Sequence, residues 1–167
     1  MEQLNLLENE NSTELPLRSC VFTGHRFLGD DFSPRALKKA IEQMILRGVT
    51  YFYNGAAMGF DLIAAEIVLK LQKKYPHIRL IVCIPCWNQD RGYSEEDKKR
   101  YVRVLRLADH QVQVSERYYD GCMLVRDRYM VQRADAMIAY CRRESGGTAY
   151  TINQFIKRYG NKNIVYL

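Results

Sequence analysis

The sequence predicts an α/β fold, a Rossmann-like three-layer sandwich whose mainly parallel sheet of about six strands has helices on both faces. Short runs of β-forming residues alternate with segments in which apolar residues recur at i, i+3, i+4 and i+7. No hairpin signal joins successive strands, so the connections are expected to be right-handed crossovers. The run "IRLIVCI" is apolar enough for a strand that is covered on both faces, as in a parallel sheet.

The first half of the chain is expected to contain three strand–helix units. The strands are predicted at 20–24, 49–53 and 78–84. After the first strand, Ser33 and Pro34 supply an N-cap and a first-turn proline for a helix that Gly48 ends. A second helix is expected behind Asp61 and a third around Tyr101, because apolar residues recur there at helical spacing.

The second half continues this alternation. Strands are predicted at 110–114, 136–141 and 163–167. One helix is expected across 122–133, and the last runs through Ile152 and Phe155 until Gly160 stops it. The prediction is therefore six strands and five helices.

Composition indicates one soluble domain. The chain has 167 residues, 47% of them apolar and 26% charged, which is typical of a globular domain with a full core. Residues 1–17 are rich in Glu, Asn and Gln without a sustained period and are predicted to form a disordered tail, which leaves 18–167 as the domain. No run approaches the roughly 20 apolar residues of a membrane span.

The charge and the cysteine content indicate which partners and which cellular compartment to expect. The formal net charge of +6 and a pI near 9.1 favour anionic partners in general. The five cysteines are odd in number and irregularly spaced, which favours a reducing cytoplasm over a disulfide framework. Cys83 and Cys86 form a C-x-x-C pair without a second pair or a matching histidine couple, so neither a metal site nor a cofactor is predicted.

Small residues mark two of the strand-to-helix bends. Because parallel strands end at one edge of a sheet, the segments "TGHR", "NGAAMG", "IPCWNQ" and "CRRESGGT" are expected to gather there. Small side chains let an anionic oxygen approach the free N–H groups of a helix start, although glycines can also serve turn geometry alone. Two such bends on one edge favour a phosphate site. Its expected residues are Gly55, Ala56, Gly59, Gly146, Gly147 and Thr148, and Asn54 and Ser145 next to them are also expected to contact the ligand.

Neither bend matches GxxxxGK[ST] or GxGxxG, so a standard NTPase or NAD-dependent dehydrogenase is not indicated. Asp61 could equally cap its helix or accept hydrogen bonds from ribose hydroxyls. Arg126 borders the apolar stripe of its helix and offers a planar, charged fork for an anion. Further contacts to base or sugar are expected from the ends of the first and third strands, namely Thr23, Gly24, His25, Arg26 and Gln89.

Several of these motifs occur together and in order: "TGHR", "NGAAMGFD" with "AAEIVL", "RDRYMV" followed by "AD", and "GGTAYT". The combination resembles the YpsA-like family of the SLOG superfamily over about Cys20 to Leu167. The resemblance implies a Rossmann-like fold and a nucleotide or nucleotide-derived ligand. It also suggests that two copies pair through helices into a homodimer.

Two related groups supply alternative functions. The lonely-guy phosphoribohydrolases cleave nucleoside monophosphates, and Arg126 with Met130 resembles their Arg-x-x-x-Met element. Ser145 stands where their second motif has proline, however, and the position of their catalytic glutamate falls on Thr151, so that loop lacks the carboxylate needed for glycoside hydrolysis. Glu66 lies too far inside its helix to replace it. The DNA-processing protein DprA binds single-stranded DNA, which the basic composition keeps open as a function.

The leading prediction is a cytoplasmic nucleotide-binding or sensor domain without a membrane partner. Phosphate binding is expected at the two small-residue bends, anion pairing at Arg126 and ribose contacts at Asp61. No catalytic residue is predicted. The sequence leaves the ligand, the pathway and any reaction open.

Overall fold

The computed structural model describes residues 17–167, so the tail predicted at 1–17 lies outside the described residues except for Leu17, which is buried in the larger core. The strands are β1 (Ser19–Gly24), β2 (Tyr51–Asn54), β3 (Arg79–Ile84), β4 (His110–Gln113), β5 (Ala136–Tyr140) and β6 (Ile164–Tyr166). The helices are α1 (Pro34–Leu46), α2 (Phe60–Leu71), α3 (Glu95–Leu107), α4 (Cys122–Val131) and α5 (Gly147–Tyr159). The predicted α/β fold is confirmed, and each expected element exists within a few residues of its predicted bounds.

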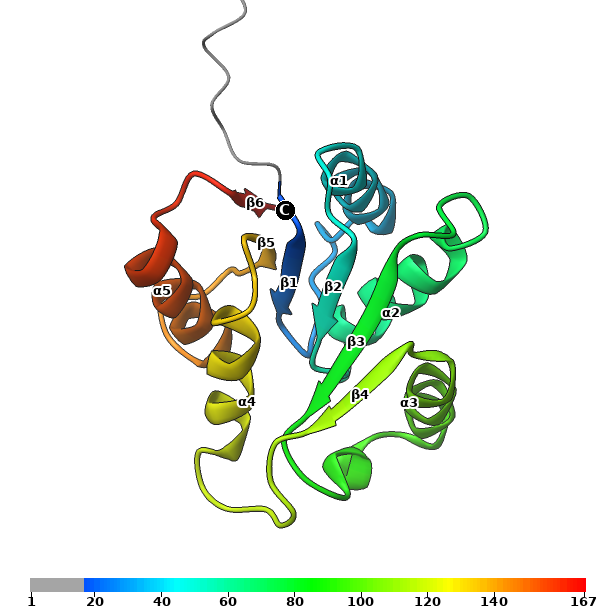
Figure 1. Ribbon diagram of the computed structural model, residues 1–167. Coiled ribbons are helices and arrows are strands. Elements are labelled where there is room, and N and C mark those ends of the chain that lie inside the picture. The colour runs from blue at the N-terminus through cyan, green and yellow to red at the C-terminus, as the bar shows by residue number, and fades with distance from the viewer. Residues whose placement is uncertain (1–16) are drawn as a thin grey trace, which may run out of the picture.

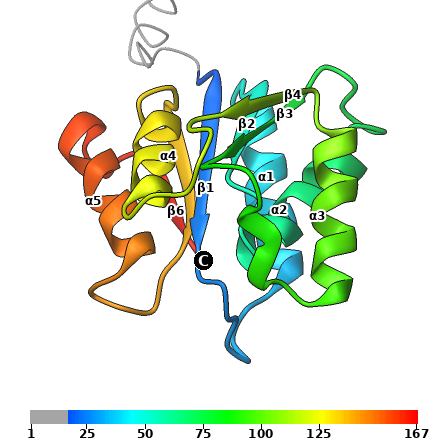
Figure 2. The ribbon, with the colours of Figure 1, turned by 90° about the horizontal axis from the view of Figure 1, so that it is seen from below.

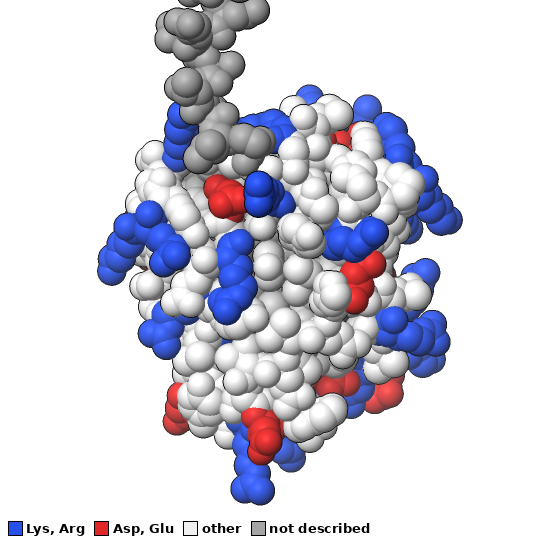
Figure 3. Space-filling model, viewed as in Figure 1, with Lys and Arg blue, Asp and Glu red and all other residues white. Residues whose placement is uncertain are grey.

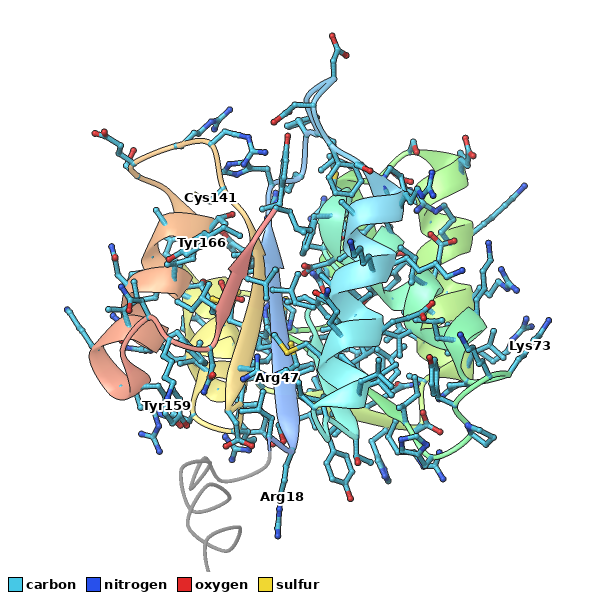
Figure 4. All side chains as sticks on the ribbon, turned by 90° about the horizontal axis from the view of Figure 1, so that it is seen from above. Arg18, Arg47, Lys73, Cys141, Tyr159 and Tyr166 are labelled. Carbon is cyan, nitrogen blue, oxygen red and sulfur yellow. The ribbon has the colours of Figure 1, made fainter. Side chains whose placement is uncertain are left out.

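All six strands form one parallel sheet in the order β4-β3-β2-β1-β5-β6 (Figure 1). The chain builds outward from β1 to β4, then returns to the other side of β1 and adds β5 and β6. Adjacent β1 and β5 are therefore the strands at which the direction of winding reverses, and ligands of such sheets bind at this point. Arg18, which precedes β1, and Cys141, which follows β5, mark opposite ends of the sheet (Figure 4).

Helices cover both faces of the sheet and create two cores. Helices α1, α2 and α3 lie on one side, and α4 and α5 on the other (Figure 2). The larger core joins residues of the first three helices to one face of the strands, including the stacked rings of Phe22 and Phe52. The smaller core joins Met130 and Phe155 to Val21 and Met137 on the other face. Apolar burial on both faces explains why the central strands are almost uniformly apolar.

Local chemistry sets the helix ends. Ser33 caps α1 by accepting a hydrogen bond from the backbone N–H of Ala36 at 3.1 Å, as predicted. Gly160 ends α5 with φ of 74°, a left-handed conformation that favours glycine. The predicted loop after β3 contains a 3₁₀ turn at Gln89–Gly92 that periodicity did not reveal, because one turn is too short to show a helical repeat.

Charged side chains are spread over the visible face rather than collected in one patch (Figure 3). Lys and Arg outnumber Asp and Glu by 25 to 19 over the whole sequence. Within residues 17–167, no helix has the length and apolar character needed to cross a membrane.

Candidate ligand-binding cleft

A cleft of about 500 Å³ opens at the carboxyl edge of the sheet. Its walls come from four parts of the chain: the end of β1 with the loop after it, the start of α2, the loop before α4 with α4 itself, and the start of α5. The lining residues used below are Thr23, Gly24, His25, Arg26, Phe27, Asp61, Tyr118, Cys122, Met123, Arg126, Asp127, Arg143, Gly147 and Thr148. The cleft therefore joins segments from both helical layers at the reversal point between β1 and β5.

The bend before α5 is open toward this cleft. No side chain caps the helix, and Gly146 at its N-cap has φ of 102°. A Cβ atom built on Gly146 or Gly147 would meet no atom within 4 Å. The first N–H groups of a helix lack intrahelical partners and carry partial positive charge. This end of α5 therefore presents unblocked donors beside Arg143, which also lines the cleft.

The bend before α2 is filled by the protein itself. A Cβ on Gly55 would lie 2.7 Å from Nη1 of Arg126, and one on Gly59 would lie 2.1 Å from the carbonyl oxygen of Arg26. Asn54 ties the bend together: its Nδ2 donates to the carbonyl of Asp61 at 2.8 Å, and its Oδ1 accepts from the N–H of Ala56 at 2.7 Å. The small residues of this bend thus make room for neighbouring protein atoms.

The Arg126 side chain is buried, with 4% of its surface exposed, and it holds several segments of the chain together. Its Nη1 donates to the carbonyl oxygens of Gly55 at 2.7 Å and Cys83 at 3.2 Å, and its Nε donates to Asp127 at 2.7 Å. The side chain therefore links α4 to the ends of β2 and β3. It still lines the cleft, and its Nη2 takes no part in these bonds.

Asp61 is buried at the inner wall of the cleft, 7% exposed. Its Oδ2 accepts a hydrogen bond from the N–H of Ala57 at 3.3 Å, whereas its Oδ1 has no hydrogen-bond partner among the described residues. Burial raises the pKa of Asp61 to about 7, although the nearby Arg126 opposes this shift. A residue that lines the cleft therefore has a buried carboxyl oxygen without a hydrogen-bond partner among the described residues.

His25 connects two walls of the cleft. Its Nε2 accepts a hydrogen bond from the backbone N–H of Arg142 at 2.7 Å, and its Nδ1 lies 3.4 Å from Oγ1 of Thr148. Burial, followed by the charges of Arg143 and Arg142, lowers the pKa of His25. A neutral ring with its proton on Nδ1 satisfies both contacts, so His25 joins the loop after β1 to the loop after β5.

The structure brings some of the predicted residues together at the cleft and leaves others away from it. Those that line it are Thr23, Gly24, His25, Arg26, Asp61, Arg126, Gly147 and Thr148. Those that do not line it are Asn54, Gly55, Ala56, Gly59, Gln89, Ser145 and Gly146. Gln89 is buried, and its Nε2 donates to the carbonyl of Gly55 at 3.0 Å. Gln89, in the loop after β3, therefore holds the bend before α2 without lining the cleft.

Sequence reasoning missed part of the lining. Phe27, Tyr118, Met123, Asp127 and Arg143 line the cleft but were not among the residues predicted for the site. Phe27 directly follows the segment "TGHR" and Arg143 lies within "CRRESGGT", so their positions held a usable clue. Asp127 is oriented by Arg126 and by Oγ1 of Thr151, which donates to its Oδ2 at 3.1 Å, and no sequence spacing reveals this contact.

The fold and the cleft together define a class: a Rossmann-like domain with a ligand cleft at the reversal point of its parallel sheet. The family model described as the YspA SLOG family, named YpsA, matches residues 32–167. The chain belongs to this family.

Two relatives carry the name UPF0398 protein. BH1768 of Halalkalibacterium halodurans is 34% identical over 129 residues, which cover 73% of this chain and 68% of the relative. The protein of Bacillus thuringiensis strain Al Hakam is 26% identical over 128 residues, covering 75% and 70%.

Two solved structures share the fold. DNA processing protein A (DprA) of Streptococcus pneumoniae matches with a TM-score of 0.67 at 15% identity, covering 89% of this chain and 50% of its own. DprA of Helicobacter pylori, described with a single-stranded DNA binding mode, matches with a TM-score of 0.65 at 19% identity, covering 89% and 64%. This chain thus spans about half to two thirds of those proteins.

Proposed function

We propose that the cleft binds a nucleotide-derived small molecule and that the protein acts as a sensor or ligand-binding domain. The open bend before α5 carries this proposal, because it offers free helix N–H groups next to Arg143 with space for an oxyanion. A phosphate at Gly147 and Thr148 would complete a helix start that no side chain caps.

Asp61 supports the sugar end of this proposal. Asp61 lines the cleft, and a ribose hydroxyl would supply the hydrogen-bond partner that its buried Oδ1 lacks. The predicted phosphate role of Gly55 and Gly59 is not part of the proposal, because Arg126 and the backbone of Arg26 occupy the space beside those glycines. The proposal therefore assigns the phosphate to the start of α5 and the ribose to the start of α2.

The proposal is tested by thermal unfolding of the full chain with a panel of nucleoside phosphates. A ligand at 100 times its Kd stabilises the folded state by about 2.7 kcal/mol. Gly147→Ala is expected to bind at least tenfold more weakly while remaining folded, because the added methyl group meets no protein atom but covers the helix start. Gly92→Ala is the matched control, since a Cβ there also meets nothing within 4 Å. Equal affinities for wild type and Gly147→Ala would contradict the proposed phosphate position.

Single-stranded DNA is the second candidate ligand. Arg26 and Arg143 both line the cleft, and the fold matches that of DprA. Oligonucleotide binding would weaken with salt, with a slope of log affinity against log salt of about −0.7 per neutralised phosphate. A slope that grows with oligonucleotide length would favour this candidate, whereas competition by a mononucleotide alone favours the small molecule.

Phosphoribohydrolase activity has weaker support. Thr151, at the position of the glutamate in the resemblance, is 1% exposed, and its hydroxyl contacts Asp127 and the carbonyl of Gly147. Glu66 pairs with Arg100 between α2 and α3. Incubation with nucleoside monophosphates and measurement of the released base tests this activity. Turnover that is lost in Arg126→Lys would favour hydrolysis over simple binding.

A further inference from the structure

Three of the side chains that were predicted to contact the base or sugar of the ligand already have protein partners. His25 is held by Arg142 and Thr148, and Gln89 bonds to Gly55 away from the cleft. Arg26 donates from its Nη2 to the sulfur of Met123 at 2.9 Å. The proposed function assigns positions to the phosphate and the sugar, so the remaining cleft surface is considered for the base.

Phe27 is exceptional among the six phenylalanines of the chain. Phe22, Phe52, Phe60 and Phe155 are at most 1% exposed, and Phe32 packs partly against the core, whereas Phe27 is 76% exposed. A bare phenyl ring in water forgoes the stabilisation of burial. Phe27 is placed at the cleft, where a ligand could cover it.

Tyr118 lines the same cleft from another part of the chain and is 66% exposed. Phe27 belongs to the loop between β1 and α1, and Tyr118 to the loop between β4 and α4. Met123, at the start of α4, adds a polarisable thioether to this part of the lining. Two aromatic side chains from separate loops thus line the cleft to which the proposed function assigns a phosphate.

The loop that carries Phe27 is fixed from the sheet. The hydroxyl of Tyr140 accepts from the N–H of Gly29 at 3.1 Å and donates to Asp31 at 2.9 Å. Arg142 also donates to Asp31, at 2.6 Å. Because the loop is held before any ligand arrives, stacking on Phe27 would not require ordering of this segment.

We propose that Phe27 and Tyr118 form an aromatic subsite that stacks the nucleobase of the ligand, while the phosphate lies at the start of α5. This inference rests on the proposed function and adds a requirement for a planar base. Stacking on aromatic side chains tolerates any base because every base has a π-face. The subsite would therefore distinguish nucleotides from sugar phosphates more strongly than one base from another.

Binding of AMP and of ribose 5-phosphate to the full chain tests the subsite by calorimetry. Wild type is expected to bind AMP at least tenfold more tightly than ribose 5-phosphate. Phe27→Ala and Tyr118→Ala should each lose most of this preference and leave ribose 5-phosphate binding unchanged. Phe27→Tyr and Tyr118→Phe should retain it, and Trp87→Ala, which removes a 67% exposed ring outside the cleft lining, is the matched control.

Two further readouts separate the outcomes. The fluorescence of a 2-aminopurine nucleotide should be quenched on binding to wild type and less quenched by the alanine variants. Unchanged preference and quenching in both variants, or equal binding of AMP and ribose 5-phosphate to wild type, would overturn the subsite but leave the proposed function standing. Failure of wild type to bind either compound would overturn both. If wild type binds an oligothymidylate but not AMP, and the Phe27→Ala and Tyr118→Ala variants lose that binding, then the aromatic subsite holds a base of a DNA strand.

Discussion

Asp61 and Arg126 occupy one buried environment but are satisfied to different degrees. Arg126 donates three hydrogen bonds to the protein, and its guanidinium lies where a larger residue at position 55 would collide with it. Asp61 keeps one oxygen without a partner among residues 17–167. A buried polar atom without a partner is costly, and Oε1 of Gln89, which does not line the cleft, is in the same situation.

Asp61 should make stability fall as pH rises. Its pKa is about 7 in the folded chain and has the ordinary value of 3.8 when unfolded, so between these values the folded state binds more protons. Stability from this group is therefore fully present below pH 4 and is lost as pH rises toward 7. The difference in unfolding free energy between Asp61→Asn and wild type should shift in favour of the variant by about 1 kcal/mol or more from pH 5 to pH 8.

Urea denaturation at the two pH values measures this shift, with Asp90→Asn, in the turn at Gln89–Gly92, as the control. His25 acts in the opposite direction: its folded pKa lies below 6.5, so its contribution is lost as pH falls below that value. Because His25 is present in both proteins, its contribution cancels in the difference in unfolding free energy between Asp61→Asn and wild type. A difference that stays constant with pH would contradict a raised pKa for Asp61.

At the scale of elements, the start of α2 is locked against the loop after β1. The carbonyl of His25 accepts from the N–H of Phe60 at 3.1 Å, and Gly59 has φ of 79° with the Arg26 backbone beside it. Gly24 is equally confined, because a Cβ there would lie 2.2 Å from the Phe60 ring. Both glycines thus serve the close packing of two chain segments.

Gly59→Ala is expected to destabilise the fold by about 3 kcal/mol or more, since backbone strain and overpacking add. Gly147→Ala, also at a helix start, should change stability by less than about 1 kcal/mol, because its added methyl group meets open space and its φ is not positive. Unfolding in urea measures both. Comparable losses in the two variants would contradict the distinction between a filled bend and an open one.

The sequence predicted the elements well because strands and helices differ in period and because Ser33 and Gly160 mark their ends locally. It also placed the candidate site at the edge of the sheet where the cleft opens, since parallel strands end together. It could not distinguish the two glycine-rich bends, because the guanidinium that fills one comes from Arg126, 71 positions away. The sequence also could not place Tyr118 at the cleft, because Tyr118 lies on a loop and a loop has no periodicity that indicates where its side chains point.

At the scale of the whole molecule, stability is expected to decline from the centre of the sheet to its edges. Strands β1 and β5 are buried along nearly their full length, whereas β4 and β6 contain exposed and half-buried positions and pair on one side only. The two cores meet at the central strands, so opening β1 disrupts both. The edges can open at lower cost.

Native-state hydrogen exchange should show this gradient. Amides of β1 and β5 are expected to exchange only through global unfolding, with free energies equal to that from urea denaturation. Amides of β4 and β6 should exchange at least tenfold faster. Mass spectrometry of peptides from each strand provides the measurement, and equal protection of β4 and β1 would contradict it.

The placement of Arg126 bears on how function is assigned within this group of proteins. An arginine at this spacing invites comparison with hydrolases, yet here its Nη1 and Nε are engaged in joining α4 to the ends of β2 and β3. Selection to keep the scaffold intact would preserve such a residue in lineages that have no catalysis at all. An arginine at this position is thus explained by the architecture alone and does not by itself indicate an enzyme.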